Sequence, residues 1–212
     1  DRLIEADKKS PKRILVVGDC MFDTYVQGRL QPTCQEGCPK FVQESVVTVP
    51  GGAANAARSL EKWESSKTIK RIDGGAGVVC LPGKGPSLPQ KVRFMDGDRC
   101  VFRYDDDLCG LNMELVRDEA KRVLRDWRPH AVLLSDYDKG MLEPEFIKYV
   151  TGICFGRGIP CVADCKRRPS LYRGAVLKCN EDYLSRNSGA LPFNNMVVTH
   201  GSANPVTWDT EI

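Results

Sequence analysis

The sequence has 212 residues, of which 42% are hydrophobic and 28% are charged, an ordinary balance for a globular protein. This length allows one domain with its own core and a small appendage. A net charge of +3 is too small to indicate a nucleic-acid or membrane-surface partner. No stretch has the roughly 18 consecutive apolar residues that a transmembrane helix needs.

The first twelve residues are charged and have no apolar core. They predict a flexible leader (residues 1–12) rather than a secretory signal, followed by a single domain over residues 13–212.

The ten cysteines are scattered, and several lie inside apolar runs, as Cys80, Cys154 and Cys161 do. Buried cysteine behaves as a small hydrophobe. The two C-x3-C pairs have no nearby histidine, which argues against a structural zinc site, and the spacing does not indicate a disulfide framework. A reducing intracellular compartment such as the cytoplasm is therefore expected.

Short apolar runs alternate with helical patterns along the chain. Five runs predict buried parallel strands: 14–17, 131–134, 160–163, 175–177 and 196–199. Three stripes with helical spacing predict amphipathic helices: 53–63, 116–127 and 144–154. This alternation predicts an α/β fold with a mainly parallel central sheet flanked by helices.

Two further stretches, 41–49 and 91–104, have the polar alternation of exposed strands and are expected to pair as a small β flap. Residues 64–90 are rich in Gly, Ser, Pro and Lys, and no element is assigned to them.

Polar residues follow the predicted strands: Asp19, Asp136, Asp164 and Asn180. Ligands of open α/β sheets bind beyond the carboxyl ends of the strands, where these side chains are expected to collect. The pair of Asp19 and Asp23 suits the binding of vicinal hydroxyl groups, because hydrogen bonds to a carboxylate are short and directional. Helix capping or a solvated turn explains the same pair equally well.

A second polar segment, Gly51-Gly52 followed by Asn55, lies at the predicted start of a helix. Glycines there allow a ligand to approach the backbone, and free helix amides can hold an anion or a hydroxyl oxygen. A purely structural turn is the alternative interpretation.

Four motifs together resemble the ribokinase-like (PfkB) carbohydrate kinases, and most closely the heptose-phosphate kinase half of the bifunctional enzyme of ADP-heptose synthesis. They are Gly18-Asp19-x-Met21-x-Asp23-x-Tyr25-x-x-Gly28, Gly51-Gly52-Ala53-Ala54-Asn55-x-Ala57-Arg58, Leu134-Ser135-Asp136-Tyr137-x-Lys139-Gly140 and Tyr172-Arg173-Gly174-Ala175.

The resemblance implies a ribokinase-like domain with lid segments at about 34–49 and 91–105. It assigns the sugar to Asp19, Asp23, Gly51, Gly52 and Asn55, with Lys91, Arg93 and Arg103 facing the phosphate of a phosphorylated sugar. It places Asp136, Asp164 and Lys166 along the cleft, and Lys166, Asn180, Glu181, Thr199 and Gly201 on the nucleotide side. The implied activity is phosphorylation of a sugar phosphate such as heptose 7-phosphate, with ATP and Mg2+; no protein metal ligands are assigned.

The chain also departs from the family pattern. The family's Asn-x-x-Glu spacing has Tyr183 at the glutamate position, and no Gly-Ala-Gly-Asp motif, which carries the catalytic base, precedes Ile212. We therefore expect the C-terminal part of the fold to be missing and activity to be impaired or absent in this form. The alternative is a degenerate, kinase-derived subunit that binds a sugar phosphate or a protein. Either version is expected to form a homo-oligomer or a larger assembly, because an incomplete fold exposes apolar surface. A Rossmann dehydrogenase is disfavoured, since no G-x-G-x-x-G follows the first strand.

Overall fold

The computed structural model describes residues 13–31, 33, 35–63, 88–107, 112–181, 183, 185, 195–199 and 206–209. The predicted leader, residues 64–87 of the unassigned stretch and Gly201 lie outside these ranges.

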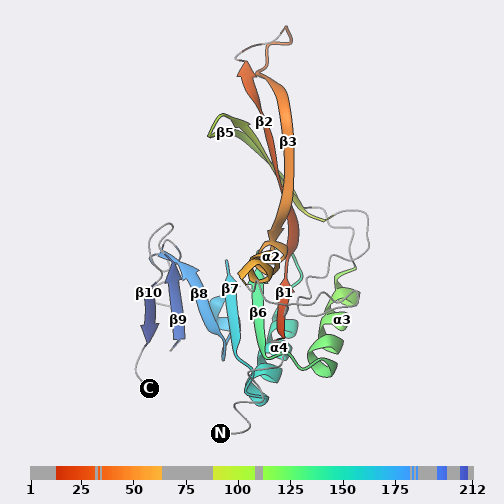
Figure 1. Ribbon diagram of the computed structural model, residues 1–212, viewed down its shortest axis with the longest axis vertical. Coiled ribbons are helices and arrows are strands. Elements are labelled where there is room, and N and C mark those ends of the chain that lie inside the picture. Colours follow the sequence, from red (N-terminus) through yellow and green to blue (C-terminus); the bar gives the residue numbers. More distant parts are fainter. Residues whose placement is uncertain are drawn as a thin grey trace.

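The body of the protein is built on a six-stranded sheet in the order β1-β6-β7-β8-β9-β10 (Figure 1). The strands are β1 Ile14–Gly18, β6 Ala131–Asp136, β7 Cys161–Cys165, β8 Val176–Asn180, β9 Asn195–Thr199 and β10 Val206–Asp209. The first five are parallel, and β10 runs antiparallel to β9. All five strands expected from the apolar runs are present, so the predicted mainly parallel α/β sheet is confirmed.

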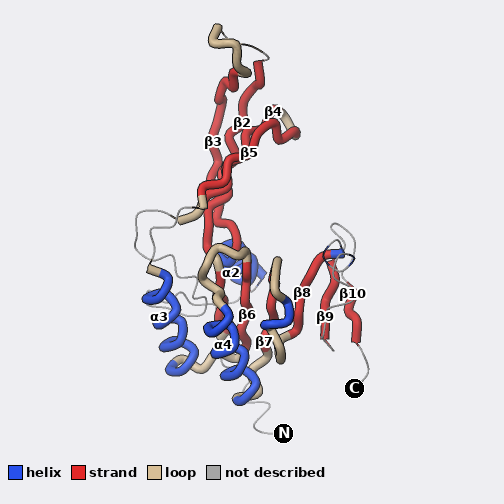
Figure 2. The backbone as a smooth tube through the Cα atoms, turned by 180° about the vertical axis from the view of Figure 1, so that it is seen from behind, coloured by secondary structure: helices blue, strands red, loops and turns tan. Residues whose placement is uncertain are grey.

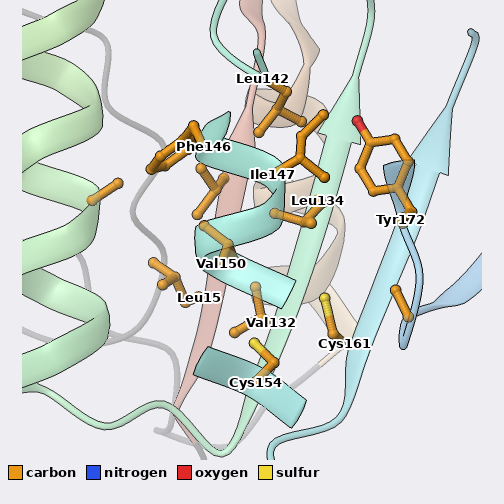
Figure 3. Packing of buried hydrophobic residues seen from close by; sticks show 14 of the residues in the cluster. Leu15, Val132, Leu134, Leu142, Phe146, Ile147, Val150, Cys154, Cys161 and Tyr172 are labelled. Carbon is orange, nitrogen blue, oxygen red and sulfur yellow. The ribbon is translucent and has the colours of Figure 1, made fainter. Parts of the chain in front are cut away.

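Three helices cover the two faces of this sheet: α2 Ala53–Trp63, α3 Met113–Asp126 and α4 Pro144–Gly156. Strand β1 shows why helices are needed on both faces of the sheet. Leu15 and Val17 pack into the larger core with α3 and α4, whereas Val16 points to the opposite face and packs against α2. Figure 3 shows the larger core, in which Phe146, Ile147 and Val150 of α4 lie over β1 and β6. A strand buried on both faces requires the continuous apolar run seen in the sequence.

A second sheet, the lid sheet, contains β2 Cys20–Gln31, β3 Lys40–Gly52, β4 Gln90–Asp96 and β5 Arg99–Asp106. Its order is β3-β2-β4-β5, and the β2–β3 pair projects far from the body (Figures 1 and 2). The two predicted flap segments are both strands of this sheet, but they do not pair with each other. Strand β2 lies between them, antiparallel to β3 and parallel to β4.

The interpretation of residues 19–23 as a turn or a helix cap is wrong, because only Asp19 separates β1 from β2. The chain leaves one sheet at Gly18 and enters the other at Cys20. Gly18 permits this, since a Cβ atom there would lie 2.0 Å from the backbone oxygen of Ser135 on β6.

The two faces of the lid sheet differ in chemistry. Residues directly opposite each other on neighbouring strands share a face. One face carries the cross-strand sets Asp23–Lys91–Asp105 and Tyr25–Arg93–Arg103. The other carries Val46–Val26–Phe94–Phe102 and Thr48–Thr24–Val92–Tyr104. The lid sheet therefore has one charged face and one mainly apolar face.

The cysteines only partly follow the expectation of free, buried thiols. Cys154, Cys161, Cys165 and Cys179 are free and buried, whereas Cys100 is free and exposed. Cys38 is exposed as well. Cys20 departs from the expectation because it is engaged in a disulfide. The helices in the described ranges include none with the length and apolar character to cross a lipid bilayer.

Candidate functional site

Asp19 is buried between the two sheets and anchors the loop that follows β6. Its side chain is 2% exposed and accepts hydrogen bonds from three backbone amides. Oδ2 accepts from the N–H groups of Tyr137 at 2.8 Å and Lys139 at 3.1 Å, and Oδ1 accepts from Met141 at 3.0 Å. Both carboxylate oxygens are therefore occupied by the protein's own backbone.

The electrostatics of Asp19 reflect two opposing effects. Burial removes water from the carboxylate and raises its pKa, whereas the three amide hydrogen bonds lower it. The nearby Asp136 carboxylate raises it further, and the net pKa lies above the ordinary value for aspartate. Asp19 has the environment of a structural anchor more than that of an exposed sugar ligand.

Asp136 has a similar environment at the end of β6. It is 1% exposed, and its Oδ2 accepts a hydrogen bond of 2.6 Å from the hydroxyl of Tyr172, which has no exposed surface. Its Oδ1 accepts from the backbone N–H of Asp138 at 2.8 Å. Burial, followed by this hydrogen bond to Asp136, raises the pKa of Tyr172. Two buried carboxylates thus hold the loop 136–141. Asp19 and Asp136 lie at the same edge of the sheet, where their positions after two predicted strands led us to expect them.

The glycine pair fits tightly against the two aspartates of the first motif. Gly52 has φ of +59°, and a Cβ atom there would lie 2.2 Å from the backbone oxygen of Asp19. A Cβ atom on Gly51 would lie 2.3 Å from Oδ2 of Asp23. These glycines allow the end of β3 to approach the protein's own chain. Asn55 lies in the first turn of α2 and is exposed.

Asp23 lies on the charged face of the lid sheet and is partly exposed. Its Oδ1 pairs with Nη1 of Arg93 at 2.8 Å, with side chains that are 22% and 25% exposed. The Arg93 guanidinium also lies 5.2 Å from the centre of the Tyr25 ring. Arg103 makes two 2.6 Å hydrogen bonds to the carboxylate of Asp105, which lowers the pKa of that carboxyl group. Both arginines named by the resemblance are thus paired with carboxylates.

Two lysines approach one aromatic ring where the lid sheet meets the body. Nζ of Lys91 on β4 lies 5.0 Å from the centre of the Tyr137 ring, and Nζ of Lys166, just after β7, lies 4.2 Å from it. Lys91 is only 9% exposed. Within the described part of the chain, neither ammonium group has a hydrogen bond or an ion pair. We call these three residues the Lys–Tyr–Lys cluster.

Desolvation and the neighbouring charges act on this cluster together. Burial lowers the pKa of Lys91, and the positive charge of Lys166 lowers it further. Asp23 and Asp105 oppose this effect, and Arg103 adds to it. Burial also raises the pKa of the Tyr137 hydroxyl. The cluster therefore holds positive charge that the protein neutralises incompletely, a favourable environment for an anion.

The residues assigned to the nucleotide lie along the ends of β8 and β9. Asn180 and Thr199 are opposite each other in the sheet. Oδ1 of Asn180 accepts from the N–H of Tyr183 at 2.9 Å, and the hydroxyl of Thr199 donates to the carbonyl of Cys179 at 3.3 Å. Glu181 follows at an exposed position. Asp164, one strand nearer the lid, pairs with Lys178 at 2.9 Å.

Sequence reasoning missed several residues that shape this region. Tyr137 and Lys139 were visible only as part of the motif around Asp136, and Tyr172 only as part of a second motif. Lys139 forms an ion pair with Asp107, which lies just after β5, so it links the loop to the lid sheet. No three His, Cys, Asp or Glu side chains in the described ranges form a group that could hold a metal ion.

Comparisons with known proteins agree with the resemblance. No protein-family model matches the chain. The bifunctional protein HldE of Hyphomonas neptunium is 30% identical over 200 residues, covering 84% of this chain and 41% of the relative. HldE of Magnetococcus marinus is 30% identical over 205 residues, covering 85% and 40%. The chain thus spans about two-fifths of the length of the curated relatives it matches.

Solved structures show the same fold at lower identity. Phosphofructokinase-2 from Escherichia coli in complex with fructose-6-phosphate superimposes with a TM-score of 0.63 at 14% identity, covering 95% of this chain and 78% of that one. Ribokinase from Arabidopsis thaliana complexed with ribose and ATP gives 0.57 at 15% identity, covering 94% and 78%. The fold is therefore ribokinase-like, and the similarity to HldE proteins and to PfkB-type carbohydrate kinases is confirmed.

Proposed function

We propose that this chain is a PfkB-type carbohydrate-kinase domain whose acceptor is a phosphorylated sugar such as heptose 7-phosphate, with ATP as phosphoryl donor. The observation that carries the proposal is the meeting of the lid's charged face with the carboxyl ends of the parallel strands, where Tyr137 contacts lysines from both parts. The sequence similarity to HldE proteins supports the same conclusion.

The residues at this junction suit both parts of a sugar phosphate. Asp23 is partly exposed and can accept hydrogen bonds from sugar hydroxyls, and Asn55 offers both a donor and an acceptor at the start of α2. Lys91, Lys166, Arg93 and Arg103 supply positive charge for a phosphate. Asp19, Gly51 and Gly52 contribute by holding Asp23 and the loop in place, as their contacts indicate.

ATP would supply the transferred phosphoryl group, and Mg2+ would neutralise its charge. In the ranges that the structure describes, the ammonium group of Lys166 has no hydrogen bond or ion pair, and the residue lies just after β7, which suits a phosphate oxygen. Asn180, Glu181 and Thr199 lie at the ends of the next strands, on the side away from the lid. Gly201 is proposed for the same side.

A specific observation favours the alternative of a binding subunit with little or no turnover. Catalysis of hydroxyl attack needs a base that can take a proton from the acceptor. Asp19, Asp136 and Asp164 at the sheet edge already have partners, namely backbone amides, Tyr172 and Lys178, and Asp23 on the lid sheet is paired with Arg93. We therefore propose that this chain binds a sugar phosphate but transfers a phosphoryl group to it slowly or not at all.

The apolar face of the lid sheet supports the proposal of a homo-oligomer. Val46, Phe102 and Tyr104 on this face are 47%, 60% and 51% exposed. A sheet face with such side chains is stabilised by packing against a second copy of itself. We expect wild-type protein to sediment as a dimer and Phe102→Glu to sediment as a monomer. Phe155→Glu, at an 82% exposed position on α4, should leave the dimer intact. Monomeric wild-type protein at high concentration would contradict the oligomer.

The experiment for function measures binding and turnover separately. We expect calorimetry to detect heptose 7-phosphate binding, and a coupled assay with ATP and Mg2+ to show little ADP release. Asp23→Asn removes a charged acceptor and should weaken binding by about tenfold or more. Asp118→Asn, at an exposed α3 residue paired with Lys121, is the matched control and should bind as the wild type does. Absence of heptose 7-phosphate binding would overturn the proposed function, and rapid turnover would overturn the weak-catalysis part.

A further inference from the structure

We propose that Cys154 and Cys161 form a redox site, at which a hydroperoxide such as hydrogen peroxide oxidises the two thiols to a disulfide that a dithiol reductant opens again. The pair lies at the N-terminal end of β7, whereas Lys166 and the proposed sugar-phosphate site lie beyond the carboxyl end of that strand. The redox site is therefore separate from the proposed function.

The fold brings these two thiols together where α4 ends and β7 begins. Cys154 lies in the last turn of α4, and Cys161 is the first residue of β7. The connection between them is held by the N–H of Ile159, which donates to the carbonyl of Cys154 at 2.8 Å. Both side chains are buried in the larger core, at 1% and 4% exposure (Figure 3). The two thiols hydrogen-bond to each other, so a small side-chain movement brings the sulfur atoms to the S–S bond length of about 2.05 Å.

The two thiols differ in how readily they lose a proton. The hydrogen bond from Cys161 lowers the pKa of Cys154 against the effect of burial, and the positive charge of Arg157 lowers it as well. The same hydrogen bond, together with burial, raises the pKa of Cys161. Since the thiolate is the nucleophile, Cys154 is the thiol that attacks the peroxide, and Cys161 is the thiol that closes the disulfide.

Oxidation then proceeds in two balanced steps. The Cys154 thiolate attacks one oxygen of hydrogen peroxide, the O–O bond breaks, and hydroxide leaves, so that Cys154 becomes a sulfenic acid. The sulfur of Cys161 next attacks the sulfenic sulfur, the S–O bond breaks, and the thiol proton of Cys161 leaves with the hydroxyl group as water. The hydroxide from the first step takes up the proton that Cys154 released. Two thiols and one peroxide thus give one disulfide and two waters, and the two electrons lost by sulfur reduce the peroxide.

A hollow in the protein surface lies beside the connection between the two cysteines. Arg157 and Ile159 of this connection line it together with Arg128 and Pro129, and its volume is about 400 Å3. Hydrogen peroxide is little larger than water, so a slight opening of the connection admits it from this hollow. The positive charge of Arg157 favours both the thiolate and the hydroxide that leaves.

A second pair of buried thiols, Cys165 and Cys179, provides the comparison. These residues follow Asp164 and Lys178, which are opposite each other on β7 and β8, so the two cysteines are neighbours across the strands. Burial raises the pKa of Cys165 to about 12, and it raises that of Cys179 as well. Both thiols therefore stay protonated at neutral pH, and we expect this pair to resist oxidation.

The first test maps the disulfide. The folded protein is treated with hydrogen peroxide, its remaining thiols are alkylated in urea, and its tryptic peptides are analysed by mass spectrometry. We expect a new link between peptides 149–157 and 158–166, which dithiothreitol removes. The variant Cys165→Ser leaves Cys161 as the only cysteine of the second peptide and should give the same link. Alkylation of both Cys154 and Cys161 after peroxide treatment, or a link that is lost in Cys165→Ser, would overturn the redox site.

The second test assigns the roles of the two thiols. Dimedone, which reacts with sulfenic acids, should label Cys154 in the variant Cys161→Ser, because no thiol is left there to close the disulfide. It should not label Cys161 in the variant Cys154→Ser, and the opposite pattern would overturn the assignment. Arg157→Gln should slow disulfide formation several-fold, whereas Arg128→Gln, on the same hollow, should not. Equal rates in these two variants would overturn the role of Arg157, and unfolding midpoints check that every variant is folded.

Discussion

Tyr172→Phe tests whether the buried hydroxyl–carboxylate contact stabilises the body of the protein. The substitution removes one oxygen atom and retains the ring, which is fully buried in the larger core. The lost hydrogen bond is 2.6 Å long and ends on a carboxylate that is 1% exposed, so water cannot easily replace it. Hydrogen bonds to charged groups contribute about 1.5–3 kcal/mol. Asp136 keeps its bond from the Asp138 amide, which places the expected cost at about 2 kcal/mol.

Urea unfolding followed by tryptophan fluorescence measures this cost. With a denaturant dependence of about 2 kcal/mol per molar urea, the midpoint should fall by about 1 M. Tyr149→Phe is the control, because Tyr149 lies on α4 with 36% exposure, and it should change stability by less than about 0.5 kcal/mol. The reasoning is refuted if Tyr172→Phe shifts the midpoint no more than Tyr149→Phe does.

The stability difference between wild type and Tyr172→Phe should also depend on pH. Burial raises the pKa of Tyr172, so the folded protein keeps the phenolic proton where the unfolded chain releases it. The unfolded state then binds fewer protons, and stability falls as the pH rises above the ordinary tyrosine value of about 10. The stability difference between wild type and Tyr172→Phe should therefore shrink above that pH. A difference that is constant to about pH 11 would contradict the buried environment of the hydroxyl.

Two further substitutions test the anchoring of the loop and of the glycine turn. Asp19→Asn places an NH2 group against backbone amide donors and should cost about 2–3 kcal/mol at neutral pH, whereas Asp118→Asn should cost less than about 0.5 kcal/mol. The pKa of Asp19 is raised in the folded protein, so the folded state holds a proton that the unfolded chain releases, and this contribution to stability is lost as the pH rises. The free energy of unfolding of wild type should therefore exceed that of Asp19→Asn by more at about pH 4 than at pH 7. Urea midpoints at both pH values test this, and the opposite trend would refute it. Gly52→Ala and Gly97→Ala both place Ala at φ near +58°, but only at Gly52 does the new Cβ meet a backbone oxygen, at 2.2 Å. Thermal unfolding should show a loss of about 1 kcal/mol for Gly97→Ala and clearly more for Gly52→Ala, and equal losses would contradict the close approach.

The body sheet could be predicted from the sequence because its strands are buried on both faces. Runs such as 14–17 and 131–134 are apolar at every position, and this pattern survives without knowledge of the neighbours. Strand β2 was missed for the opposite reason. Its 12 residues mix buried and exposed positions, and they begin one residue after β1 ends. Nothing in the local sequence shows that a single residue, Asp19, carries the chain from one sheet to another.

The site was predictable in its location but not in the state of its side chains. Asp19 and Asp136 follow predicted strands, so their meeting at one edge follows from parallel topology. Their partners are backbone amides of a loop 118 to 122 residues away and a hydroxyl 36 residues away. Sequence patterns carry no information on such contacts. The ion pair between Arg93 and Asp23 could not be predicted either, because it depends on the parallel register in which β2 pairs with β4.

These contacts divide the residues of the candidate site into two groups with different chemistry. Asp19 and Asp136 lie inside the protein and direct the loop that carries Tyr137, while Lys91 and Lys166 bring uncompensated charge to that ring from two different parts of the fold. A substitution in the first group should alter folding stability and ligand binding together, because it moves the ring. A substitution of either lysine should alter ligand binding with little loss of stability, since the lysines have no hydrogen bond or ion pair to lose in the described ranges. Comparing the loss of folding stability with the loss of ligand affinity in each variant therefore distinguishes a residue that positions the site from one that contacts the ligand.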